Sequence, residues 1–122
     1  MRAIIDSDVL IDYLQGVEKA RVELDRYPKR EISILSWMEV LAGADTAMED
    51  RECRRFLATF TIHPLSEEVA AEAVKLRRQF RLRLPDAIIW ATAKTQACLL
   101  VTRNTRDFPS REPGVRVPYK LD

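Results

Sequence analysis

Short apolar runs alternate with longer segments of helical periodicity along the chain. Runs of consecutive apolar or β-branched residues bounded by polar ones are typical of strands buried in a parallel sheet. We expect strands at residues 2–6, 31–35, 61–63 and 98–101, and a weaker one at 115–117. Between them, apolar residues recur three and four positions apart, which predicts amphipathic helices. We place these helices at residues 7–15, 17–27, 36–43, 48–60, 66–80 and 86–96.

The alternation of strands and helices predicts the fold class. It favours an α/β protein in which helices cover both faces of a parallel sheet through right-handed crossovers. The chain has 122 residues, which is the length of one domain. We therefore expect a single domain over residues 1–122 with three layers, α/β/α. Its central, mainly parallel sheet should have about four or five short strands.

Composition and charge exclude several classes of protein. Twenty Lys and Arg residues against nineteen Asp and Glu leave a net charge of +1, so the chain is not a polycation that coats nucleic acid by charge alone. Cys53 and Cys98 lack the spacing of a metal site, and we expect both to be reduced thiols. The sequence has no secretory signal and no apolar run near the ~20 residues of a membrane span. We expect a cytoplasmic protein without membrane contact.

Four acids occupy positions where parallel sheets bind ligands. Asp6 ends the first strand, Glu39 lies one turn into the helix after the second, and Asp107 is in the loop after the strand at 98–101. Asp86 stands in the first turn of the apolar helix at 86–96. Since ligands bind outside the carboxyl ends of parallel strands, we expect the four carboxylates to converge at one edge of the sheet.

Each acid also has a structural interpretation. Asp6 could cap the helix that follows it, and the segment from Ser36 to Glu39 matches a capping box. Asp86 could complement a helix dipole, and Asp107 could form a turn. Four converging carboxylates repel one another, however, and a cation would relieve that repulsion.

Oxygen ligands without competing soft ones favour Mg²⁺ or Mn²⁺. A cation held by carboxylates is suited to the hydrolysis of phosphodiester bonds. The sequence has neither a nucleophile elbow nor a phosphate-binding glycine loop, as expected where no side-chain nucleophile is needed.

Four blocks of the sequence carry a family resemblance. They are DSDVLID at residues 6–12, S-x-x-S-x-x-E at 33–39, LPDAIIWATA at 84–93 and T-x-N-x-x-D-F at 102–108. In this order they resemble the PIN-domain ribonucleases, in particular the VapC toxins of prokaryotic toxin–antitoxin pairs. The resemblance extends over nearly the whole chain, from residue 2 to residue 108.

The resemblance implies a PIN-like fold and a metal-dependent endoribonuclease that is usually dimeric and is held inactive by a cognate antitoxin. The acids that it identifies as catalytic, and as the residues that hold Mg²⁺ or Mn²⁺, are Asp6, Glu39, Asp86 and Asp107. The side chains that would support these carboxylates are Ser7, Thr102 and Asn104. Asp8 stands where many relatives carry an uncharged Asn or Ser, and we expect it to face solvent.

A cationic stretch precedes Asp86. Residues 75–84 contain five Lys or Arg residues and no acid. A site ringed by carboxylates repels phosphate, so cations nearby are needed to hold an RNA backbone. Arg81 and Arg83 are the residues that we expect to bind RNA.

Two other functions remain open from the sequence. One is a catalytically silent PIN-fold module that binds a partner protein, although clustered buried charge would then destabilise the fold without serving any chemistry. The other is a receiver-like phosphoacceptor domain that binds Mg²⁺. A receiver needs an acid at the end of its third strand and a lysine after its fifth. Here the third predicted strand ends in His63, and the strand at 98–101 is followed by Arg103, so neither requirement is met. We expect His63 to be a hydrogen-bonded residue at a strand end rather than a general base.

Overall fold

The computed structural model describes residues 1–121 and has at its centre a sheet of five parallel strands. The strands lie in the order β3-β2-β1-β4-β5. Their bounds are β1 (Ala3–Ile5), β2 (Glu31–Ser33), β3 (Thr61–His63), β4 (Leu99–Val101) and β5 (Val115–Arg116). The predicted α/β class and the parallel sheet of short strands are confirmed.

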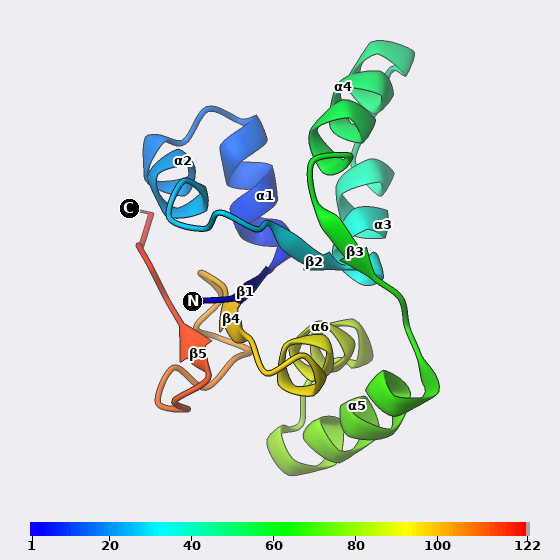
Figure 1. Cartoon of the computed structure of the whole chain (residues 1–122), viewed down its shortest axis with the longest axis vertical. Helices are drawn as coiled ribbons and strands as arrows, with labels where there is room; N and C mark the ends of the chain where they lie inside the picture. The colour runs from blue at the N-terminus through cyan, green and yellow to red at the C-terminus, as the bar shows by residue number, and fades with distance from the viewer. Residues whose placement is uncertain (122) are drawn as a thin grey trace.

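Helices cover both faces of this sheet. They are α1 (Ser7–Leu14), α2 (Glu18–Leu24), α3 (Ile34–Ala42), α4 (Ala47–Leu57), α5 (Glu67–Phe80) and α6 (Leu84–Thr95). Figure 1 shows α5 and α6 below β2 and β3 and the first four helices above these two strands. Within residues 1–121, none of the helices is long and apolar enough to cross a membrane.

The strand β1 is buried on both faces, which explains its uninterrupted apolar sequence. Side chains alternate across a strand. Ile4 packs into the core that the sheet forms with α5 and α6, together with Leu100 of β4 and Trp90 of α6. Ala3 and Ile5 point into the second core, beneath α1 and α2. The residue that follows β1 is therefore anchored by a rigid central strand.

The start of α3 differs from the prediction. The helix begins at Ile34 rather than at Ser36, and its N-cap is Ser33. The Ser33 hydroxyl accepts a hydrogen bond of 3.1 Å from the Leu35 N–H, which satisfies one of the free donors of the first turn. The alternative interpretation of Ser36 and Glu39 as a capping box is wrong, because Ser36 lies inside the helix. The helix predicted at residues 48–60 also ends earlier, at Leu57.

The carboxyl ends of β1 and β4 lie next to each other. Ile5 is in register with Val101, and the Asp6 N–H donates a hydrogen bond of 2.8 Å to the Val101 carbonyl. The residues immediately after these two strands, Asp6 and Thr102, are therefore neighbours at the same edge of the sheet.

Candidate active site

Asp6 is at the centre of this edge and is buried, with 5% of its surface exposed. It is the N-cap of α1, and one carboxylate oxygen accepts a hydrogen bond of 2.8 Å from the Ser7 N–H. The other oxygen accepts a hydrogen bond of 2.7 Å from the Thr102 hydroxyl. The structural role expected of Asp6 as a helix cap is thus combined with a fixed position at the edge.

Ionisation of Asp6 is disfavoured in this environment. Burial is the main cause that raises its pKa to about 7, and the negative charge of Asp8 raises it further. The hydrogen bonds donated by Thr102 and Ser7 lower the pKa and offset part of this effect. The charge of Asp86 also raises the pKa of Asp6, so the two carboxylates are close enough to repel each other.

Ser7 connects Asp6 to Glu39. The Ser7 hydroxyl donates a hydrogen bond of 2.8 Å to Glu39 Oε1 and lies 3.3 Å from Asp6 Oδ1. Glu39 is an exposed residue of α3. Since α3 is capped by Ser33, the carboxylate of Glu39 is not needed to cap its own helix and is directed to α1 instead.

Asp86 and Asp107 form the other half of the group. Asp86 is buried in the first turn of α6, whereas Asp107 is half-buried in the loop after β4. Arg83 is the N-cap residue of α6. Its Nε lies 3.4 Å from Asp86 Oδ2, and its Nη2 lies 3.9 Å from Asp107 Oδ2. Burial raises the pKa of Asp86 despite the positive charge of Arg83, and the charges of Asp107 and Glu39 raise it further. These effects link all four acids electrostatically.

Asn104 orients Asp107. Its side-chain nitrogen Nδ2 donates a hydrogen bond of 2.8 Å to Asp107 Oδ2, and its side-chain oxygen Oδ1 accepts one of 3.2 Å from the Asp107 N–H. The Asn104 N–H in turn donates to the Thr102 hydroxyl at 3.0 Å. The loop at residues 102–107 therefore holds Asp107 with the same residue, Thr102, that supports Asp6.

Asp8 does not face solvent, so our expectation for it is wrong. Its carboxylate accepts a hydrogen bond of 3.2 Å from the Arg103 N–H. The other oxygen, Oδ1, is buried and has no hydrogen-bond partner within residues 1–121. Burial raises the pKa of Asp8. Asp8 thus adds a fifth carboxylate beside Asp6. The signal available in the sequence was its position one turn before Asp12 on α1.

The donor set suits a hard divalent cation. The carboxylate, hydroxyl and amide groups around Asp6 and Asp86 offer oxygen atoms, as Mg²⁺ and Mn²⁺ prefer. In the part of the chain that the structure describes, no three His, Cys, Asp or Glu side chains lie close enough to form a ready-made cage. Mg²⁺ does not need one, since it keeps several waters and binds through one or two carboxylates. The residues present fit such an ion.

The predicted RNA-binding arginines differ in their surroundings. Arg83 is mostly exposed but faces Asp86 and Asp107. Arg81 is exposed and ends α5 in the left-handed conformation, with a φ of 56°. This turn reverses the chain between α5 and α6, so both arginines lie directly before the first turn of α6.

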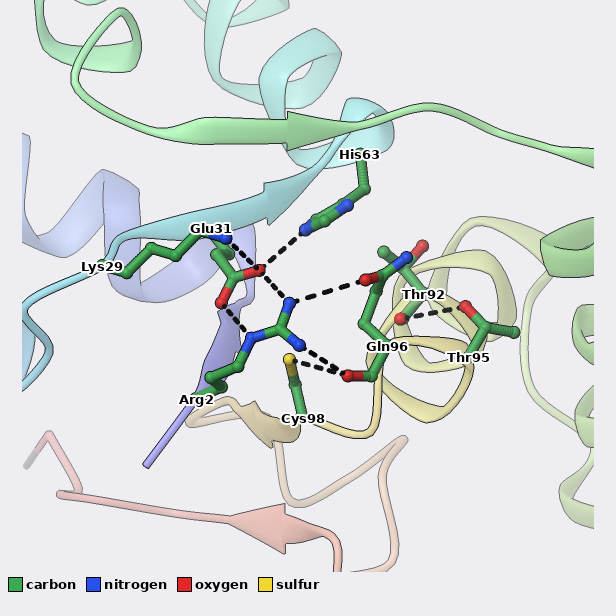
Figure 2. Close-up of polar contacts among 8 residues, drawn as sticks. All are labelled: Arg2, Lys29, Glu31, His63, Thr92, Thr95, Gln96 and Cys98. Carbon is green, nitrogen blue, oxygen red and sulfur yellow. Dashed lines mark hydrogen bonds and ion pairs between the residues drawn. The ribbon is translucent and has the colours of Figure 1, made fainter.

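His63 is a hydrogen-bonded residue at the end of β3, as we predicted, and it belongs to a different cluster. Figure 2 shows its ring directed at Glu31, whose Oε1 lies 2.9 Å from His63 Nε2. Glu31 is fully buried and also receives two hydrogen bonds from the Arg2 guanidinium. Arg2 precedes β1 and contacts Gln96 at the end of α6. His63 thus contacts the buried carboxylate that pairs with Arg2 and does not join the four acids.

The sheet order is incompatible with a receiver domain. Receiver-like folds have the strand order β2-β1-β3-β4-β5, whereas here β1 lies between β2 and β4. The receiver-like interpretation is therefore wrong.

Comparison with known proteins identifies the family. The PIN domain family model matches residues 3–111. The chain is 38% identical to ribonuclease VapC10 of Mycobacterium tuberculosis H37Rv, over 94% of each chain. It superimposes with a TM-score of 0.91 on a chain of a toxin–antitoxin complex from Klebsiella pneumoniae, at 41% identity and over 98% and 99% of the two chains. DNA-bound VapBC from Salmonella typhimurium shares the fold, with a TM-score of 0.77 at 20% identity over 95% and 96%. The chain belongs to the PIN domain family.

Proposed function

We propose that this protein is a metal-dependent endoribonuclease and the toxin of a toxin–antitoxin pair. The observation that carries the proposal is the group formed by Asp6, Glu39, Asp86 and Asp107, whose members are linked by shared hydrogen-bond partners and by mutual repulsion. Its relatives are a ribonuclease from Mycobacterium tuberculosis and a chain of a toxin–antitoxin complex. The first similarity supports the nuclease activity, and the second supports the role as a toxin–antitoxin component.

In this proposal the four acids would hold Mg²⁺ or Mn²⁺. The chemistry that such an ion supplies is activation of a water near neutral pH and stabilisation of the charge that develops on the phosphoryl oxygens. Ser7 and Thr102 keep the carboxylates of Asp6 and Glu39 in place by donating hydrogen bonds to them. Asn104 does the same for Asp107.

Arg81 and Arg83 would bind the RNA backbone beside these acids. Arg83 lies close to Asp86 and Asp107, so a cation bound by those carboxylates would weaken its ion pairs and leave its guanidinium free to contact phosphate. Arg81 is exposed at the adjacent turn. In this arrangement the acids hold the ion that supports hydrolysis, and the arginines bind the RNA.

The experiment that tests the activity is cleavage of a structured RNA by the purified protein. We expect cleavage in Mn²⁺, no cleavage in EDTA, and recovery when Mn²⁺ is added back in excess. The thermal midpoint should also rise with Mn²⁺, because a ligand that binds only the folded state stabilises it. If Mn²⁺ raises the midpoint but no RNA is cut, the chain is the silent PIN-fold module rather than an enzyme.

We also propose that a cognate antitoxin inhibits the site and that the protein is a cytoplasmic homodimer. An antitoxin segment bearing arginine would pair with the carboxylates in place of the cation, so an arginine-containing antitoxin peptide should bind more weakly as Mn²⁺ increases. Unchanged affinity would exclude this mode of inhibition. Light scattering of the isolated chain should give twice the mass of 14.1 kDa.

A further inference from the structure

Asp12 is a buried acid that the proposed chemistry does not use. It lies on α1 with 2% of its surface exposed. Its two carboxylate oxygens accept hydrogen bonds of 2.6 and 2.8 Å from the Arg103 guanidinium. The hydroxyl of Tyr119 donates a third hydrogen bond, of 2.7 Å. Bidentate pairing of this kind fixes both position and orientation.

These three residues join segments that are far apart in the sequence. Asp12 belongs to α1, Arg103 to the loop after β4, and Tyr119 to the C-terminal segment that follows β5. Tyr119 is itself buried, with 8% of its surface exposed. The C-terminal segment is therefore attached to α1, the helix that Asp6 caps.

Arg103 stands between two residues that contact the acids. Thr102 donates to Asp6, and Asn104 holds Asp107. The backbone N–H of Arg103 donates to Asp8, while its side chain turns away to Asp12. Fixing Arg103 at both its backbone and its side chain therefore fixes the path of the loop at residues 102–107.

We propose that Asp12, Arg103 and Tyr119 form a clamp that positions the loop at residues 102–107 for cation binding. The proposal rests on the proposed function, because it assigns the clamp to the same four-carboxylate site. None of the three residues has to touch the cation or the RNA. They are positioning residues, which act through Thr102 and Asn104.

A second cluster of the same chemistry provides a matched control. Glu23 of α2 is 3% exposed and accepts hydrogen bonds of 2.8 and 2.9 Å from the Arg116 guanidinium. It also accepts one of 2.6 Å from the Tyr27 hydroxyl. The side chains of Arg103 and Arg116 are 32% and 33% exposed. The side chains of this cluster join α2 to β5 and contact no side chain of the loop at 102–107. The Arg116 carbonyl accepts a hydrogen bond of 3.0 Å from the Thr102 N–H, a backbone contact that substitutions of the cluster's side chains leave in place.

The test compares Tyr119→Phe with Tyr27→Phe. Each substitution removes one buried hydroxyl that donates to a carboxylate already paired with an arginine. Mn²⁺ binding to each purified protein is measured by calorimetry at a temperature where thermal melting shows both to be folded. We expect Tyr119→Phe to weaken Mn²⁺ binding about tenfold, as loss of supporting contacts around metal ligands does. Tyr27→Phe should stay within about twofold of wild type, as for an independent site.

A second pair strengthens the comparison. Arg103→Lys keeps the charge but loses the bidentate geometry, and Arg116→Lys does the same in the control cluster. We expect only Arg103→Lys to weaken Mn²⁺ binding and to lower kcat for RNA cleavage without a matching rise in KM. Equal effects within each pair would overturn the clamp while leaving the proposed nuclease intact. Failure of the wild type to bind Mn²⁺ would instead refute the proposed function itself.

Discussion

The hydroxyl of Thr102 donates a hydrogen bond of 2.7 Å to the carboxylate of Asp6, from a position 96 residues further along the chain. Both side chains are buried, and both follow central strands of the sheet. The same hydroxyl accepts a hydrogen bond from the Asn104 N–H. One threonine thus connects the acid after β1 to the loop that carries Asp107.

Thr102→Val should impair the site without changing the shape of the core. A hydrogen bond to a charged group contributes about 1.5–3 kcal/mol, and its donor favours the ionised carboxylate. Its loss should raise the pKa of Asp6 further and shift the acidic limb of the pH–rate profile upward by about one unit or more. Thr102→Ser retains the hydroxyl and is the control, with a profile close to wild type. An identical profile for the valine variant would show that this hydrogen bond does not influence Asp6.

Asp6→Asn should stabilise the protein at neutral pH in the absence of metal. The pKa of Asp6 is raised to about 7 in the folded state, against about 3.9 in the unfolded chain. Its contribution to stability is thus complete below about pH 4 and is lost as the pH rises through about 7. The loss is at most about 4 kcal/mol, since one pKa unit corresponds to about 1.4 kcal/mol. Asparagine is an equally good N-cap, so the start of α1 is preserved.

Chemical denaturation in EDTA at pH 4 and pH 8 measures this effect. Wild type should lose more stability between the two values than Asp6→Asn does, because only the wild type must ionise a buried carboxylate at residue 6. The same dependence on pH in both proteins would mean that burial does not raise the pKa of Asp6 in the folded state.

How far the sequence predicts this site depends on the range of each interaction. The strands that end at Asp6 and Val101 follow from short apolar runs, and the rule for parallel sheets places their carboxyl ends at one edge. The partners across that edge do not follow from the sequence. Asp8 and Asp12 look like polar residues on the exposed face of a helix, and only the fold brings Arg103 to both of them.

The capping of α3 shows the limit at short range. Two serines, Ser33 and Ser36, each precede apolar residues with helical spacing, and the second is followed by Glu39 in the pattern of a capping box. The helix begins after Ser33, in part because β2 ends there in register with His63 of β3. Sheet pairing decided a boundary that the local pattern placed at Ser36.

Arg81→Ala and Arg83→Ala should weaken RNA binding about equally for all sequences. Each phosphate contact that is lost should lower the slope of log affinity against log salt by roughly 0.7 for single-stranded RNA. Binding is measured without metal in an Asp86→Asn background, where no RNA is cut. Arg51→Ala, at an exposed position of α4, is the control and should leave the slope unchanged. An unchanged slope for all three variants would show that residues 75–84 are a solvated helix end that makes no phosphate contact.

The most direct measurement is the initial rate at which Asp86→Asn cleaves a labelled RNA at saturating Mn²⁺, relative to wild type. Asp86 is buried and is repelled by Asp107 and Glu39, so the substitution removes one carboxylate from the centre of the group. Asp45→Asn makes the same substitution at an exposed position before α4; it is the control and should cleave at the wild-type rate. We predict that the rate for Asp86→Asn falls at least about a hundredfold, the upper range for loss of a group that supports a metal site. A rate equal to that of Asp45→Asn would contradict the assignment of the four carboxylates as a metal-dependent nuclease site.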